Sequence, residues 1–402
     1  MSSSEPSAAD QQLIDHAQRH GYTITAKQLA TWRRAGLMPG NIPGGGLGRG
    51  KGSTSRPAPE SFDLVLGLAR RAGPGKRPTD LALLLFAEGL PVPETTVRAA
   101  FRAAVDTITL PGEDDDPDDD LDERLDNVAG HLAETGQAMT LVPARARRID
   151  EHIARLARDA GETWPPPELA SWDENPERAP STTPQDATLT AAAAVLTGSL
   201  SLQEIGDMLR AMNPGAGANP IASLVETTQN DVPDIAEVIA PDGTLALGPA
   251  GDARDLLRDL TDKAPLEDLA AAWQTVQRVR EWALDLCMRV ESELEAGQRG
   301  EAVAEWQTSR YLGAGLAMLS TLRDRRWPPA QRALDTMLVL YQLHEFRLLD
   351  RIVPGCQWHL LQSEGVMPPP VRVLLKDLID QDSAPAQPAG MSPRAGTVRP
   401  GS

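Results

Sequence analysis

The helical periodicity of this chain is interrupted near its beginning by a glycine-rich, basic run. Apolar residues recur at helical spacing within residues 10–39 and again from Ser61, whereas residues 40–59 show no apolar period. Frequent glycine opposes both a regular helix and a long strand, so this run is predicted to be a loop or an irregular β-hairpin. Any fold of the chain must therefore place a cationic, irregular segment between two helical segments.

Two short helices are expected before that run. The first covers residues 10–20 and ends at a glycine. Thr25 can cap the second helix, in which Leu29 and Trp32 are three residues apart and face the first helix. Gly36 ends the second helix. Two short helices joined by a glycine turn form a candidate helix-turn-helix, with Trp32 as a packing residue.

The charge of the chain is distributed unevenly. The formal net charge of the whole protein is −18. Residues 27–77 nevertheless hold ten Lys and Arg against two Asp and Glu, and residues 111–402 hold 26 basic against 48 acidic groups. This asymmetry indicates a basic binding module attached to an acidic body, because a polyanion such as DNA is bound by clustered cations.

The run Leu29-Ala-Thr-Trp-Arg-Arg-Ala-Gly-Leu-Met-Pro39 resembles the recognition-helix signature of MerR-type winged helix-turn-helix transcriptional regulators. Leu29, Trp32, Gly36 and Leu37 match the family's leucine, aromatic and Gly-Leu positions. The glycine-rich run stands where the family has its wing, although it is longer and lacks the usual aromatic–arginine core. The resemblance covers about 90 residues and implies a DNA-binding fold.

Candidate DNA contacts follow from these positions. One of Arg33 and Arg34 is expected to contact a phosphate or a guanine edge from the end of the second helix. The cations of the glycine-rich run would hold phosphates in a salt-sensitive way, because glycine lets the backbone approach the duplex closely. The full set of predicted DNA-binding residues is Lys27, Arg33, Arg34, Arg49, Lys51, Ser53, Thr54 and Arg56.

Other interpretations of the same residues exist. The arginine pair is also typical of a solvated helix end, and a glycine run is also typical of a linker. The run Gly44–Ser53 is superficially similar to a nucleotide-binding P-loop. However, Gly52 follows Lys51 where a P-loop has Ser or Thr, and no apolar strand precedes the run. Nucleotide binding is therefore not favoured.

Composition shifts divide the chain into six regions. The boundaries follow breaks in helical periodicity, charge runs and proline-rich stretches. The predicted regions are a winged helix-turn-helix DNA-binding domain (10–110), an acidic linker (111–126), a helical connector with a Pro-rich arm (127–185), a small helical region with a hairpin (186–260), a C-terminal helical domain (261–380) and a disordered tail (381–402).

Several kinds of chemistry find no support in the sequence. The two cysteines, Cys287 and Cys356, provide neither a disulfide framework nor a zinc site. No catalytic residues, metal ligands or cofactor site are predicted, so the protein is not expected to be an enzyme. No apolar run is long enough to span a bilayer, and a soluble, cytoplasmic protein without membrane contact is expected.

The predicted fold class is mostly α, with an N-terminal winged helix-turn-helix-like domain, an acidic linker and a C-terminal helical bundle. The leading interpretation is a transcriptional regulator that binds double-stranded DNA as a homodimer through its C-terminal helices, because such readers usually act in pairs. A small-molecule effector pocket in the same helices is left open. The alternative is a helical scaffold protein whose basic N-terminal unit binds an acidic protein partner.

Overall fold

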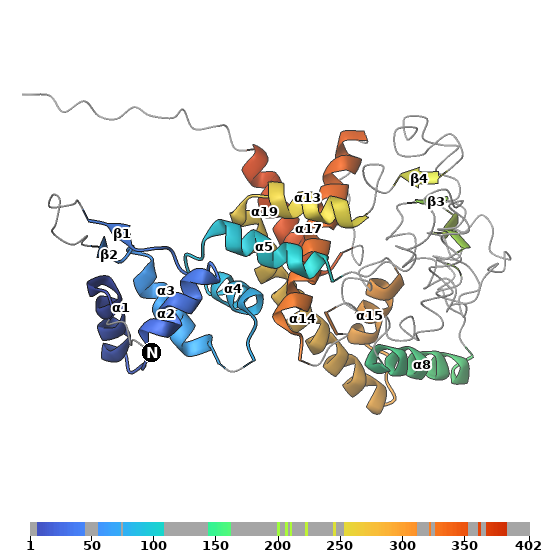
Figure 1. Cartoon of the computed structure of the whole chain (residues 1–402). Coiled ribbons are helices and arrows are strands. Elements are labelled where there is room, and N and C mark those ends of the chain that lie inside the picture. The colour runs from blue at the N-terminus through green and yellow to red at the C-terminus, as the bar shows by residue number, and fades with distance from the viewer. Residues whose placement is uncertain are drawn as a thin grey trace, which may run out of the picture.

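The structure is a computed structural model, and it is mostly helical (Figure 1). It describes residues 6–44, 55–73, 75–107, 144–161, 199–201, 253–311, 326–352 and 367–383, with short pieces at 206–207, 210, 222–223, 244–246, 321–322 and 361–362. The helices are α1 Ala8–Arg19, α2 Ala26–Arg34, α3 Ser61–Arg71, α4 Pro78–Ala87, α5 Glu94–Val105, α8 Ala144–Asp159, α13 Ala253–Lys263, α14 Leu266–Glu295, α15 Glu301–Tyr311, α17 Pro329–Ile352 and α19 Pro369–Ser383. The acidic linker, the Pro-rich arm and residues 384–402 of the tail predicted above lie outside these residues, whereas residues 381–383, predicted to belong to the disordered tail, form the end of α19.

α2 begins and ends at the residues that the sequence indicates, whereas α1 begins at Ala8, before the predicted start at residue 10. The Ser7 side chain caps α1, and Gly21 follows its end with φ +82°. Thr25 and Gln28 form a reciprocal capping box at the start of α2. After α2, Gly36 adopts φ +72°, and the Leu37 amide donates to the Trp32 carbonyl, which completes a Schellman motif. Local sequence therefore sets the length of both helices.

A short antiparallel strand pair follows α2. β1 (Ile42–Pro43) pairs with β2 (Ser55–Arg56), so that Ile42 lies opposite Arg56. The pair forms the base of the glycine-rich segment, and β2 lies against α1. The sequence predicts either a loop or an irregular β-hairpin for this segment, and its described ends pair as in a hairpin.

α3, α4 and α5 lie where apolar residues recur at helical spacing after Ser61. The sequence favours Thr79 as the cap of α4, because threonine is a common N-cap residue, but Arg77 is the N-cap and Pro78 is the first helical residue. Proline suits that position because the first helical amide has no acceptor within the helix. α4 is apolar on nearly all sides, as its place among α3, α5, α14 and α17 requires.

One apolar core runs from the N-terminal helices into the C-terminal helices. It includes Leu13, Leu29 and Leu64 near the chain start, and Trp273 and Met337 from α14 and α17. A chain of edge-to-face rings crosses this core: Phe86 contacts Phe101, and Phe101 contacts Trp273, each pair with centroids 5.9 Å apart. The predicted regions 10–110 and 261–380 therefore share a core.

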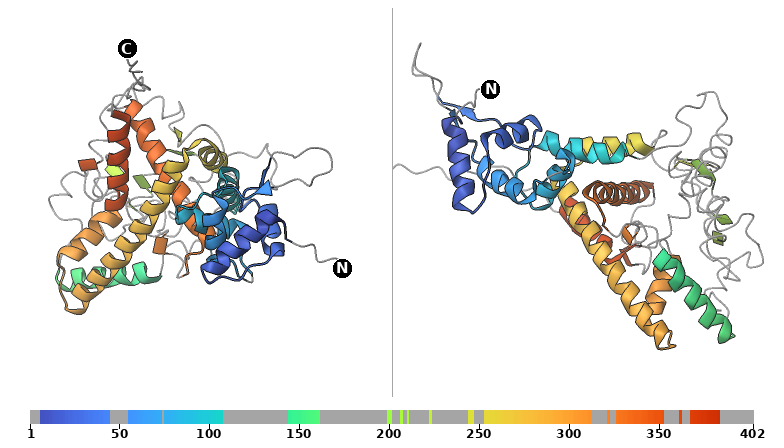
Figure 2. Two further views of the ribbon diagram at one scale, coloured as in Figure 1. Left: turned by 90° about the vertical axis from the view of Figure 1, so that its left-hand side faces the viewer. Right: turned by 60° about the horizontal axis from the view of Figure 1, so that its bottom comes forward.

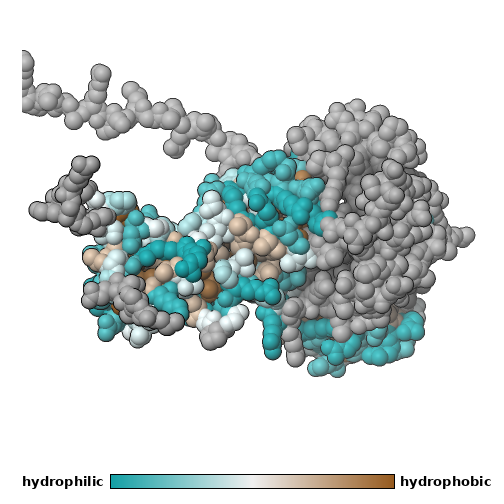
Figure 3. All heavy atoms as spheres, in the orientation of Figure 1, coloured by the Kyte–Doolittle hydropathy of each residue, from teal (hydrophilic) through white to brown (hydrophobic). Residues whose placement is uncertain are grey.

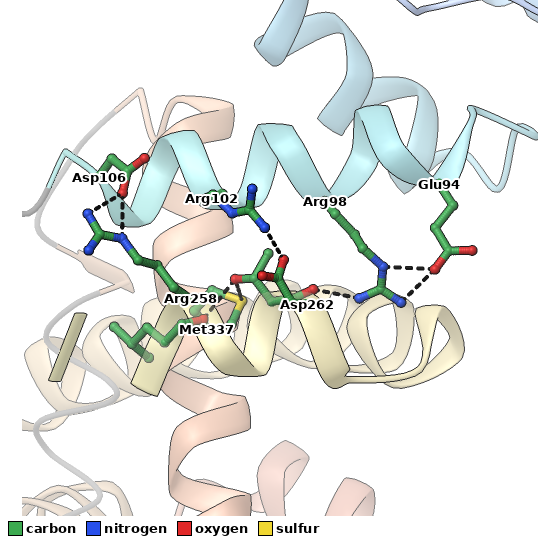
Figure 4. Close-up of polar contacts among 9 residues, drawn as sticks. Glu94, Arg98, Arg102, Asp106, Arg258, Asp262 and Met337 are labelled. Atoms are coloured by element: carbon green, nitrogen blue, oxygen red, sulfur yellow. Dashed lines mark hydrogen bonds and ion pairs between the residues drawn. The ribbon is translucent and has the colours of Figure 1, made fainter. Parts of the chain in front are cut away.

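Polar contacts border that core where α5 meets α13 (Figure 4). Arg98 donates to the Thr261 carbonyl at 2.5 Å and to Glu94 at 2.8 Å. Arg102 of α5 pairs with Asp262, and Arg258 of α13 pairs with Asp106 at 2.8 Å. These ion pairs are largely exposed, so they fix the register of the two helices more than they stabilise their contact.

The long helix α14 connects the shared core to a second one (Figure 2). Its first half, as far as Val279, belongs to the shared core, and its second half, from Ala283, packs against α8 and α15. Arg280, which interrupts the apolar seam in the sequence, lies between the two cores with its guanidinium over the Trp327 ring at 4.8 Å. The break in periodicity therefore coincides with the change of core.

A side chain joins α14 to α15 at the far end of the second core. The Glu293 carboxylate accepts hydrogen bonds from the amides of Gly300, Ala302 and Val303, each at 3.0 Å. Burial raises the pKa of Glu293, but these three bonds outweigh that effect and lower it below its ordinary value. Glu293 thus satisfies the first amides of α15, which have no acceptor inside that helix.

The second strand pair differs from the prediction. Thr244–Ala246 forms β4 as a strand was expected there, but its partner in the described residues is β3 (Ser199–Ser201). The sequence predicts a hairpin between Val238-Ile239 and Thr244–Leu247, because they flank the turn residues Pro241-Asp-Gly243, but Val238-Ile239 lies outside the described residues. Ser201 and Glu204 have the spacing of a capping box, which predicts a helix over residues 201–212, but Ser201 ends β3 instead. Pairing between segments so far apart in the chain leaves no local sequence signal.

The surface of the described residues is hydrophilic over α8 and α13, and more apolar over α5 (Figure 3). Among the helices that the structure describes, none combines the length and apolar character needed to cross a bilayer.

We expect Gly36→Ala to destabilise the protein more than Gly89→Ala. Both glycines have positive φ, so alanine is strained at either position. At Gly36, however, an added Cβ would also lie 2.7 Å from Thr96 Oγ1, whereas nothing lies within 4 Å at Gly89. Thermal unfolding should show losses of about 2 kcal/mol and about 1 kcal/mol respectively. Gly40→Ala, which meets neither problem, is the neutral control.

We expect Glu293→Ala to lower the free energy of unfolding by about 1–2 kcal/mol, because three amides at the start of α15 lose their acceptor. Urea unfolding measures this loss. Glu295→Ala removes an exposed carboxylate from the same turn and should change stability little. Equal effects of the two substitutions would contradict the capping role.

Candidate nucleic-acid interface

The exposed face of α2 is cationic and small. Lys27, Ala30, Thr31 and Arg34 are exposed and follow one another at the three- and four-residue steps of a single helix face. The opposite face holds Leu29 and Trp32, which are buried in the shared core. No Asp or Glu occurs in α2. The helix therefore presents short side chains flanked by two cations, without a carboxylate that would repel an anion.

The two arginines at the end of α2 have different environments. Arg34 is exposed and makes no ion pair with another residue in the described ranges. Arg33 is mostly covered, with 19% of its side chain exposed. Its Nη2 lies 2.6 Å from Oδ1 of Asp10 in α1 and donates to Oδ1 of Asn41 at 3.0 Å. Of the two, Arg34 is thus the one that a ligand can reach directly.

The strand pair brings another cation to this end of the molecule. Arg56 is exposed on β2, opposite Ile42 of β1. Arg49, Lys51, Ser53 and Thr54, predicted to bind phosphates, belong to the segment between β1 and β2 that lies outside the described residues. The structure therefore brings Lys27, Arg34 and Arg56 to the same unit as exposed cations, and their neighbours in the glycine-rich run stay predictions.

Carboxylates pair with the arginines of α3 and α5. Arg70 and Arg71 of α3 both pair with Glu88, at 3.0 and 2.6 Å. On α5, Arg98 pairs with Glu94 and Arg102 with Asp262. Ion pairs therefore take up these four arginines of α3 and α5, in contrast to the exposed Arg34 of α2.

Sequence reasoning missed Asp10 and Asn41 as parts of this site. Neither residue belongs to a motif, and Arg33 is separated from Asp10 by 23 positions in the sequence. The sequence held only a weak signal for the Asp10–Arg33 ion pair. Asp10 is in the first turn of α1 and Arg33 is in the last turn of α2, and antiparallel packing of two such helices can bring these charges together. The predicted set of DNA-binding residues also omits Lys76 and Arg77, which are exposed just before α4.

Histidine and cysteine side chains, which could bind a metal or act as nucleophiles, make packing contacts instead. The His16 ring stacks near His20, with centroids 4.5 Å apart, and edge-on to Phe62 at 5.1 Å. No cluster of three or more potential metal ligands occurs among the described residues. Cys287 is buried, and burial raises the pKa of its thiol to about 11. That thiol stays protonated at neutral pH and is therefore a poor nucleophile.

The chain matches no known family model, and no significant match was found among curated proteins or solved structures. The interpretation of this site therefore depends on its own geometry and charge.

We expect the pairing of Asp10 with Arg33 to make stability pH-dependent. Burial raises the pKa of Asp10, but Arg33, with Ser7 and Asn41, lowers it below the ordinary 3.8. The pairing thus stabilises the fold above the unfolded-state pKa, and this stabilisation is lost as the pH falls through the lowered folded-state pKa. Asp10→Asn should cost about 1 kcal/mol at pH 7 and progressively less near pH 3.

Thermal unfolding at several pH values measures this dependence. Asp15→Asn, in the same helix but exposed, is the matched control and should leave the pH profile as in the wild type. A loss from Asp10→Asn that stays constant between pH 7 and pH 3 would contradict the pairing.

Proposed function

We propose that the protein is a DNA-binding transcriptional regulator whose N-terminal unit contacts duplex DNA through α2 and the β1–β2 strand pair. The observation that carries this proposal is the acid-free, cationic face of α2 beside a strand pair that holds a basic, glycine-rich segment. The order of two helices, a strand pair and further helices is also the order expected of a winged helix-turn-helix domain, which the sequence resembles.

The dimensions of α2 suit a DNA groove. A helix of nine residues is about 14 Å long, and the major groove is about 12 Å wide. Ala30 and Thr31 occupy the middle of the exposed face, and their short side chains let the helix backbone approach the base edges. Lys27 and Arg34 flank them, where they would contact phosphates or, for Arg34, a guanine edge.

The β1–β2 strand pair supplies the second contact. Arg56 would bind a phosphate beside the groove, together with Arg49, Lys51, Ser53 and Thr54 in the segment that the strands delimit. Glycines in that segment let amide groups reach phosphate oxygens. These contacts would anchor the protein without reading sequence, so they give the complex a steep salt dependence.

The charge of the remaining chain restricts where DNA can bind. Residues 111–402 are strongly acidic, and in Figure 1 α1, α2 and the strand pair form one end of the molecule, while α8, β3 and β4 lie at the other. Repulsion by the acidic body would confine a duplex to the N-terminal end. The proposal includes a homodimer through the C-terminal helices, which would place two copies of α2 on two half-sites.

We expect Lys27→Gln, Arg34→Gln and Arg56→Gln each to weaken binding to duplex DNA by about three- to tenfold and to reduce the salt slope of log K by about one. Fluorescence anisotropy over a range of salt concentrations measures both quantities. Lys263→Gln, which removes an exposed lysine from α13, should change neither quantity.

Failure of the full-length protein to bind any duplex at low salt would contradict the proposal. Because an acidic protein partner is also a polyanion, polyglutamate is included as a competitor in the binding assay. Crosslinking of the protein to chromosomal DNA then shows whether it occupies discrete sites. Discrete DNA sites support the regulator, whereas binding to polyglutamate alone, without DNA sites, supports the alternative scaffold protein.

A further inference from the structure

Three segments of the N-terminal unit, α1, α2 and the start of β1, meet at Arg33. The residue belongs to the last turn of α2, its ion-pair partner Asp10 belongs to the first turn of α1, and its hydrogen-bond partner Asn41 directly precedes β1. Both contacts use the same guanidinium nitrogen, Nη2, at 2.6 and 3.0 Å. The Arg33 side chain therefore connects α2 to α1 and to the start of the strand pair.

We infer that Arg33 is a positioning residue that sets the place of the β1–β2 strand pair relative to α2, and that it does not contact DNA. This inference rests on the proposed function. It differs from the sequence-based expectation, which treated Arg33 and Arg34 as equivalent candidates. The structure separates them because Arg34 is exposed, whereas Arg33 is mostly covered and already paired with a carboxylate.

The charge of Asp10 makes a direct DNA contact by Arg33 unfavourable. To reach a phosphate, the guanidinium would have to leave a carboxylate that is itself only 17% exposed. That carboxylate would then stay partly buried without its cation, beside an approaching polyanion, which is costly. Kept in place, the pair has no net charge and holds the chain at Asn41, at the point where it enters β1.

Rigid placement matters because two separate elements must meet one duplex. A helix in the groove and a strand pair on the flanking phosphates bind together only if their spacing matches the DNA, and loose coupling lowers the affinity of both. The β1–β2 pair has only two residues in each strand, so it cannot fix its own orientation. Arg33 supplies an attachment from α2, and the packing of β2 on α1 supplies another.

Asp10→Asn tests this inference through the sign of its effect. If Arg33 were a DNA contact, removal of the competing carboxylate would free it and strengthen DNA binding. If Arg33 positions the strand pair, the same substitution weakens binding by about tenfold, although it removes a negative charge. Asp15→Asn removes the same charge from an exposed position of α1 and should leave binding unchanged or slightly tighter.

The salt slope provides a second readout. Arg33→Gln should lower the affinity while the slope of log K against log salt stays as in the wild type, because no phosphate contact is lost. Arg34→Gln should lower both. Tighter binding of Asp10→Asn, or a reduced slope for Arg33→Gln, would overturn the positioning role.

A measurement without DNA separates this inference from the proposed function. Amide hydrogen exchange in β1 and β2 of the full-length protein should be faster in Asp10→Asn than in Asp15→Asn, because the attachment at Asn41 is loosened. Equal exchange in the two variants would overturn the positioning role even if the wild type binds DNA. Faster exchange in Asp10→Asn, in a protein that binds no duplex at low salt, would support the attachment and reject the DNA-binding proposal alone.

Discussion

The contact between Phe101 and Trp273 is the interaction on which the placement of the N-terminal unit depends. Trp273 is fully buried, and its ring meets the edge of Phe101 on one side and the guanidinium of Arg332 on another, at 4.4 Å. The polar contacts between α5 and α13 are mostly exposed, and exposed ion pairs contribute little. Aromatic burial therefore holds α5 against the C-terminal helices, and the ion pairs select its register.

Arg332 shows how the C-terminal helices tolerate a covered cation. Its guanidinium stacks on Trp273 and, at 5.0 Å, on Trp327. Burial lowers its pKa to about 10, although the nearby charge of Glu281 opposes that shift. Because this pKa still lies well above neutral pH, the side chain stays charged, and the two indole faces can attract the cation. This stack fixes α17 against α14, and through Trp273 it also supports the ring contact with α5.

Local features of the fold could be predicted from the sequence, and contacts between distant segments could not. Thr25, Gly21 and Gly36 act within one helical turn, so propensity and capping rules were enough to locate the C-terminal end of α1 and both ends of α2, although α1 begins before its predicted start. The Arg102–Asp262 pair joins residues 160 positions apart, and nothing in either local sequence identifies its partner. Pairing of β3 with β4 was missed for the same reason.

The candidate site shows the same division between local and distant information. The segment from Leu29 to Pro39 was enough to predict a short helix with a buried Trp32 and exposed cations. It could not distinguish Arg33 from Arg34, because that difference depends on Asp10, which the fold brings from another helix. Two adjacent arginines on a helix point about 100° apart, so one can be covered while the other is exposed.

This distinction changes how the basic excess of residues 27–77 is interpreted. Ten basic residues against two acidic ones would indicate a broad cationic surface. The structure assigns Arg33, Arg70 and Arg71 to ion pairs with Asp10 and Glu88, both of which lie outside that range in sequence. Among the described residues of that range, the exposed cations outside these pairs are Lys27, Arg34, Arg56, Lys76 and Arg77. Affinity for DNA would then depend less on total charge than on holding these few cations in register with the phosphates, which is the role that the Asp10–Arg33–Asn41 contact can perform.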